Sequence, residues 1–209
     1  MAYRIKEFKN KKVEDTYERC MAELAGFYGF KITRNRPRII VVESRAIIDS
    51  LKGSKTEDWL VGWLDGRNIF LLDQPKMETE SCHGKYDNEQ YKALIKHELS
   101  HAFTRSLSWP GYVPAWLNEG IAIYVSGQNK FKKPINKFHN FLDSYDKAER
   151  DVYKEAGFAI ELLVNKFGKK KLLTLVKKLR GIKNKSGYIR AFKGTYGFSP
   201  SYAKFNGLK

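Results

Sequence analysis

The spacing of apolar and polar positions predicts the order helix, strand, helix in the first part of the chain. Apolar side chains recur at helical spacing over 12–28, and Gly29 follows them as a stop signal. The β-branched run 37–43 predicts a strand. A short helix over 46–51, ending at Gly53, is predicted after it.

A strand pair and two helices are predicted next. The apolar stretches 59–64 and 68–72 flank an Asp-Gly dipeptide, whose tolerance of positive φ suits a hairpin turn. Asp87 is followed three residues later by Gln90, a capping box that opens a long helix ending near Ser108. A Trp-Pro-Gly sequence stops that helix, and Pro114 suits the first turn of the next one, over 115–124.

The last third of the chain is predicted to be mainly helical. We expect a helix after Pro134, a longer one over 151–167 and a lysine-rich one over 169–180. A last turn or two near 188–192 precedes a tail that is expected to be irregular over 196–200. A small mixed sheet followed by helices is an α+β pattern.

Length and composition fit one domain over residues 1–209, of which 42% are hydrophobic. We expect a sheet-containing part over about 1–108, a helical part over 109–209 and the functional cleft between them. Cys20 and Cys82 are too few for a disulfide framework, so we expect reduced thiols. No apolar run has the length of a membrane span, and Met1–Lys6 lacks the apolar core of a signal peptide, which favours a cytoplasmic protein without a transmembrane segment.

Positive charge is concentrated at the C-terminus. Residues 1–161 contain 26 Lys and Arg against 23 Asp and Glu, whereas residues 162–209 contain 13 Lys and Arg and no acidic residue. The Lys/Arg-rich stretch 166–209 could bind nucleic acid, an anionic membrane surface or an acidic partner protein. It could equally be the solvated face of lysine-rich helices.

The central chemical motif is His97-Glu98-Leu99-Ser100-His101. Positions i and i+4 lie on one face of a helix, so both imidazoles can reach one Zn²⁺ while Glu98 acts as base toward a water. Catalytic zinc sites ordinarily take three protein ligands. Glu119 follows on the next helix, where an antiparallel return can bring its carboxylate over the histidines, and we expect Gly120 to let these two helices approach closely.

These residues resemble a known family. His97-Glu98-x-x-His101 followed by the sequence Trp-Leu-Asn-Glu-Gly-x-Ala over 116–122 resembles the gluzincins, which include thermolysin and the zinc aminopeptidases, and is especially similar to their peptidase MA-like branch. The resemblance implies a zincin-like fold, the metal ligands His97, His101 and Glu119 for one Zn²⁺, and Glu98 as catalytic base.

The resemblance extends to a later helix, whose sequence from Tyr153 to Gly168 is similar to that of the family. It departs from the aminopeptidases in a spacer one residue shorter before Glu119 and in lacking a stretch that would bind a substrate amino terminus. Thr104 and Leu107 stand where a metzincin would continue with Gly and His, which disfavours that class.

The expected reaction is hydrolysis of a peptide or protein substrate through a metal-activated water, with Glu98 taking its proton and passing it to the leaving amine. An oxyanion donor is needed as well. Tyr153 is the candidate, although it could simply pack in the core, and His139 and Tyr124 are alternatives. His83, in a loop beside Cys82, could be a metal ligand or merely a solvated side chain.

The strand over 68–72 is expected to lie nearest the site, where it could pair with an extended substrate, or be an ordinary sheet strand without a ligand. Three functions therefore compete. They are a zinc peptidase, a peptidase that docks on nucleic-acid-associated proteins through 166–209, and a catalytically silent protein that is stabilised by its metal.

Overall fold

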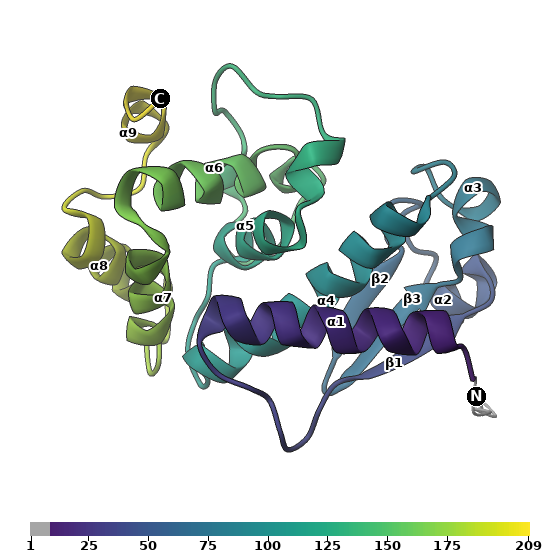
Figure 1. The fold of residues 1–209 in the computed structure, drawn as a ribbon. Coiled ribbons are helices and arrows are strands. Elements are labelled where there is room, and N and C mark those ends of the chain that lie inside the picture. The colour runs from purple at the N-terminus through teal and green to yellow at the C-terminus, as the bar shows by residue number, and fades with distance from the viewer. Residues whose placement is uncertain (1–8) are drawn as a thin grey trace.

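The computed structural model describes residues 9–209 and has a mixed α+β architecture with a small sheet, which confirms the predicted coarse class. The predicted absence of a signal peptide at Met1–Lys6 lies outside the described residues. Figure 1 shows the strands gathered at one side of the molecule and the C-terminal helices at the other. Within residues 9–209, no helix is long and apolar enough to cross a membrane.

The sheet contains β1 (Arg38–Val42), β2 (Gly62–Asp65) and β3 (Asn68–Leu72) in the order β1-β3-β2. β2 and β3 form the predicted hairpin, in which Asp65 pairs with Asn68. β1 runs parallel to β3 and pairs with its other side. Of the two alternatives for residues 68–72, the ordinary sheet strand is the one observed, and pairing with a substrate is excluded because β3 is the central strand and has partners on both edges. β1 and β2 are the two outer strands, and of these β2 lines the cleft described below.

The helix that carries the histidine motif is α4 (Asn88–Ser108), and it begins as predicted. The Asp87 carboxylate accepts a hydrogen bond from the Gln90 backbone N–H at 2.8 Å, and the Gln90 side chain accepts one from the Asp87 N–H at 2.9 Å. This reciprocal capping box satisfies two backbone donors that the helix itself leaves unpaired. It fixes where α4 starts and so which face of the helix the motif occupies.

Helix α1 (Lys11–Tyr28) packs along α4 and ends at Gly29 in a left-handed conformation, as predicted. The buried Tyr28 hydroxyl lies 2.8 Å from both Ser100 Oγ and Thr104 Oγ1 on α4. Hydrogen bonds of this kind inside a core fix one helix against the other, because an unpaired buried hydroxyl is unfavourable. The contact anchors α4 from behind the histidine motif.

Helix α2 (Arg45–Lys52) supplies a clamp for the segment that leads into β2, and the single turn α3 (Met77–Glu80) closes it. The guanidinium group of Arg45 donates hydrogen bonds of 2.6–3.1 Å to four backbone carbonyls, those of Glu57, Asp58, Leu60 and Glu80. Arginine suits this position because its donors form a rigid planar fork. The start of β2 is thereby held in place.

Helices α5 (Ala115–Ser126) and α6 (Val152–Phe167) cross at very close range. A Cβ atom added to Gly120 would lie 2.7 Å from the Ala156 carbonyl oxygen and 2.8 Å from Ile160 Cγ1. The expectation that Gly120 allows α5 to approach α4 is therefore wrong, because the crowded contact is with α6. This contact lies one residue beyond Glu119.

The C-terminal helices differ in extent from the prediction. α7 (Lys169–Lys178) was expected, but α8 (Lys185–Tyr196) is longer than the predicted turn and α9 (Tyr202–Gly207) forms just beyond the stretch that was expected to be irregular. Aromatic side chains of α8 and α9 pack against Trp116 of α5, which is fully buried. These helices hold α5 from the side opposite the sheet.

No α-helix follows Pro134, contrary to prediction, and the segment contains only the single 3-10 turn Phe141–Asp143. The backbone of this segment is hydrogen-bonded by a side chain from another element. The buried carboxylate of Glu155 on α6 accepts hydrogen bonds from the N–H groups of residues 139–141 at 2.9–3.3 Å. A tertiary contact therefore supplies the hydrogen bonds that a helix would have supplied internally.

Candidate metal centre

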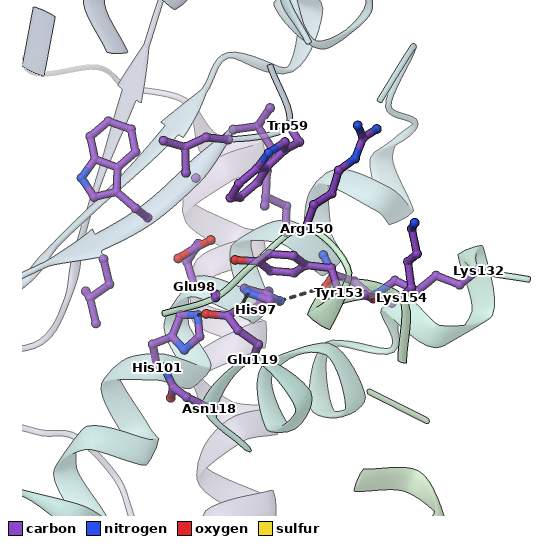
Figure 2. Close-up of a pocket in the computed structure, with 18 of the residues that line it drawn as sticks. Trp59, His97, Glu98, His101, Asn118, Glu119, Lys132, Arg150, Tyr153 and Lys154 are labelled. Atoms are coloured by element: carbon purple, nitrogen blue, oxygen red, sulfur yellow. Dashed lines mark hydrogen bonds and ion pairs between the residues drawn. The ribbon is translucent and has the colours of Figure 1, made fainter. Parts of the chain in front are cut away.

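A cleft of about 1170 Å³ opens between β2 at the edge of the sheet, α4 and the N-terminal parts of α5 and α6. Its walls are residues 59–64 with β2, one face of α4, the first turn of α5, and two stretches at 128–135 and 147–154. Figure 2 shows His97, Glu98, His101 and Glu119 meeting at the centre of this cleft. The residues of the sequence motif therefore lie where a ligand could reach them.

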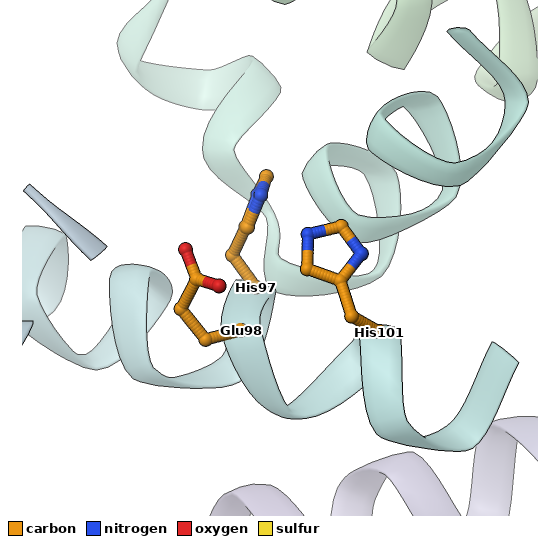
Figure 3. A group of neighbouring side chains, drawn as sticks. All are labelled: His97, Glu98 and His101. Carbon is orange, nitrogen blue, oxygen red and sulfur yellow. The ribbon is translucent and has the colours of Figure 1, made fainter. Parts of the chain in front are cut away.

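The two histidines and Glu98 project from one side of α4 (Figure 3). One ligand atom from each of His97, Glu98 and His101 can be chosen so that all lie within 4.8 Å of one another. His97 and Glu98 are buried, at 5% and 4% exposure. This group could hold a metal ion. The i, i+4 spacing predicted the two histidines as ligands, with Glu98 beside them as a base and not as a ligand.

Glu119 reaches the same histidines from α5. One of its oxygens lies 3.1 Å from Nε2 of His97, and the other lies 3.7 Å from Nε2 of His101. Burial alone would raise the pKa of Glu119, but the neighbouring His101 and His97 lower it below the usual value for a glutamate. Helix α5 thus delivers an ionised carboxylate to the histidine pair.

The donor set fits a cation. Two imidazole nitrogens and a carboxylate are ligand types that zinc takes, and each Nε2 atom has a Glu119 oxygen within 3.7 Å. Nδ1 of His97 lies 2.9 Å from Gln128 Oε1, so it donates its proton there and leaves a lone pair on Nε2. A lone pair facing a carboxylate at 3.1 Å is favourable only if a positive charge, a proton or a metal ion, lies between them.

Glu98 has a different environment from Glu119. It forms no hydrogen bond or ion pair with any residue in the described range 9–209, and burial raises its pKa to about 7, with His101 and Lys52 opposing the rise. A Cβ on Gly62 of β2 would lie 3.0 Å from Glu98 Oε1, so the glycine makes room for the carboxylate. Glycine inside a strand often marks such a close approach, and this signal was present in the sequence.

Tyr153 is the one candidate oxyanion donor that reaches the cleft. Its pKa is raised by burial and by the nearby carboxylates Glu119 and Glu98, so its phenol keeps its proton. Its ring packs 5.5 Å from that of Trp59. The alternatives Tyr124 and His139 are wrong, since neither lines the cleft.

Two residues of the cleft were not anticipated. Gln128 orients His97, and Lys132, whose burial lowers its pKa to about 8, donates to the Tyr153 carbonyl at 2.6 Å. Neither position has a pattern that would single it out. His83 lines the cleft as well, but its Nε2 lies 2.8 Å from the Trp59 carbonyl oxygen and it is not one of the clustered ligands.

No protein-family model matches this chain, and no curated protein matches it. What the chain does is therefore inferred from the geometry of the site and from its motifs.

Proposed function

We propose that the protein is a zinc-dependent peptidase of gluzincin type with a zincin-like fold. Glu119 carries the proposal, because its two oxygens face the Nε2 atoms of both histidines while Glu98 stands beside them without a partner. The motif resemblance supports the same residues. The expected substrate is a peptide or protein.

His97, His101 and Glu119 would hold one Zn²⁺. Catalytic zinc sites use three protein ligands, whereas structural sites use four. When bound, the ion would supply Lewis acidity toward a carbonyl and lower the pKa of a water. The hydrogen bond from His97 to Gln128 fixes which ring nitrogen faces the site.

Glu98 would act as general base and then as general acid. A glutamate side chain within reach of the reacting groups can accept a proton and release it again. It would take the proton that the attacking water loses and give it to the amine nitrogen as the C–N bond breaks. Its lack of hydrogen-bond partners leaves both oxygens free for this transfer.

Tyr153 and β2 would position the substrate. The protonated Tyr153 phenol can donate a hydrogen bond to the carbonyl oxygen as negative charge develops there. β2 has an open edge beside Glu98, and an extended peptide can add to such an edge through main-chain hydrogen bonds. Both features favour a peptide over a small rounded substrate.

The test combines metal analysis with two variants. The purified protein is expected to bind one zinc ion per chain and to cleave casein. Glu98→Gln should keep the zinc and lose about 10²–10⁴-fold in cleavage rate, because only the proton acceptor is removed. His101→Ala should lose both, because a ligand is removed.

Two results would count against the proposal. One is a Glu98→Gln variant that cleaves casein as fast as the unaltered protein, and the other is a folded protein that takes up no zinc. If zinc is bound but nothing is cleaved, the metal has only a stabilising role. These outcomes separate the enzyme from the silent metal-stabilised protein.

Docking through the basic stretch 166–209 stays a prediction of the sequence. None of these residues lines the cleft, so any binding there would be separate from the chemistry. Binding to DNA that weakens steeply as salt is raised would support such docking. No binding at low ionic strength would exclude it.

A further inference from the structure

The cleft wall beyond Tyr153 is strongly cationic. Five of its side chains, here called the cationic wall, carry positive charge; they are Lys132, Lys133, Lys147, Arg150 and Lys154. In Figure 2 the three labelled members lie on the same side of the histidine pair as Tyr153. The carboxylates that line the cleft within residues 9–209 are Glu98 and Glu119, both already assigned to the metal and its base.

This excess does not follow from the overall charge. Residues 1–161, which include every residue of the cleft, have 26 Lys and Arg against 23 Asp and Glu and are thus nearly neutral. The basic C-terminal stretch contributes nothing to the lining. The positive charge of the wall therefore depends on which side chains of the segment 132–154 face the cleft.

The acidic residues of the segment 132–154 do not line the cleft. Asp143 accepts a hydrogen bond from the Tyr202 hydroxyl at 3.1 Å, and Asp146 accepts one from the Tyr112 hydroxyl at 2.7 Å. Glu149 and Asp151 do not line the cleft either. The segment 132–154 thus contributes five cationic side chains and no carboxylate to the lining of the cleft.

Two of these cations lack a compensating ion pair. Lys133 and Arg150 form no ion pair in the described part of the chain. Lys132 donates to the neutral carbonyl of Tyr153, and the opposite charge that acts on it is Glu119 of the candidate metal site. Lys147 and Lys154 pair with Glu149 and Asp151, but these pairs are exposed. Exposed pairs of this kind contribute little and exchange easily for another partner.

We propose that the cleft selects acidic peptides, with Asp or Glu side chains in the part of the substrate that passes along the cationic wall. The proposal rests on the proposed function, since it names the substrate class of the same site. Complementary charge favours such a ligand and disfavours a basic one. β2 would bind the main chain of the peptide, and the cationic wall would contact the acidic side chains of the peptide.

The experiment uses three fluorogenic peptides of one length that differ only in the residues flanking the cleaved bond, which are Glu, Gln or Lys. At low ionic strength, the Glu peptide should be cleaved with about tenfold higher kcat/KM than the Gln peptide, and the Lys peptide should be cleaved least, since each exposed contact adds a modest factor. The preference should shrink at 0.5 M NaCl because salt screens exposed charges.

A matched pair of variants locates the effect. Lys133→Glu with Arg150→Glu reverses two charges of the wall and should abolish the preference for Glu over Gln. Lys170→Glu with Lys193→Glu reverses two exposed charges on α7 and α8, away from the cleft, and should leave the preference intact. A preference that survives the first pair, or equal cleavage of all three peptides, would overturn the proposal.

Failure of the proposed function would look different, because none of the peptides would be cleaved. The selectivity is then measured by fluorescence anisotropy of the labelled peptides on the zinc-treated Glu98→Gln protein. Binding of the Glu peptide about tenfold more tightly than the Gln peptide would support the acidic preference. Equal affinity, or tighter binding of the Lys peptide, would overturn it.

Discussion

The substitution Gly120→Ala probes the closest helix contact near the site. The added methyl group would meet the Ala156 carbonyl oxygen at 2.7 Å and Ile160 Cγ1 at 2.8 Å. The first neighbour is backbone, so relief requires α5 and α6 to separate. Overpacking of this kind destabilises by about 1–3 kcal/mol, whereas alanine gains about 0.5–1 kcal/mol over glycine in a helix. The net loss should be about 1 kcal/mol, within the range of about 0–2.5 kcal/mol that these two effects allow.

Gly26→Ala is the matched control. Gly26 also lies inside a helix, but no atom lies within 4 Å of the position where its Cβ would be. Only the gain in helix propensity applies there, so stability should rise by about 0.5–1 kcal/mol. For a chain of this size, 1 kcal/mol corresponds to about 2–4 °C in Tm, so the two variants should move in opposite directions.

Thermal unfolding followed by circular dichroism measures both variants, and zinc titration adds a second readout. Because Glu119 precedes Gly120, separation of α5 from α6 should also weaken zinc binding in Gly120→Ala, with no change in Gly26→Ala. A Gly120→Ala protein that is as stable as Gly26→Ala and binds zinc normally would refute the account of this contact.

Three further predictions follow from single contacts. Gln128→Leu should weaken zinc binding by about 10–100-fold, because His97 loses the hydrogen bond that orients it, and an unchanged zinc Kd would contradict this. Iodoacetamide at pH 8 should modify the exposed Cys82 and spare Cys20, whose burial raises its pKa to about 11; peptide mass mapping would reveal the contrary result. Tyr28→Phe should lower the free energy of unfolding by about 1 kcal/mol through the lost bonds to α4, and an unchanged urea midpoint would exclude that role.

Local signals predicted much of the fold. The capping box of Asp87 and Gln90, the Asp-Gly turn of the hairpin and the stop at Gly29 all act within a few residues, and each lies where it was expected. The coarse α+β class follows from the order of these elements. Such features are encoded by side chains next to the backbone that they fix.

Features that depend on distant contacts were not predicted. Whether β3 has a free edge stayed open, because its parallel pairing with β1 joins segments far apart in the chain. The segment after Pro134 looked helical, yet Glu155 satisfies its backbone from another helix. Sequence periodicity contains no information about either contact.

Part of the candidate site could likewise be predicted from the sequence, and part of it could not. His97, Glu98 and His101 share one helical face, so their grouping could be read from spacing. The approach of Glu119 was expected from an antiparallel return, but the roles of Gln128 and Lys132 depend on how a loop far along the chain folds back. Those residues could not have been found without the structure.

The clamp made by Arg45 has a consequence for the entropy of substrate binding. Its guanidinium fixes four carbonyls around the segment that enters β2, so this wall of the cleft is ordered before any ligand arrives. Fixing these backbone groups before binding avoids the loss of freedom that an unrestrained segment would suffer on pairing with a ligand, about 1–2 kcal/mol for each backbone residue ordered. One arginine, remote from the histidines, would thus lower the entropic cost of adding an extended ligand to the edge of β2.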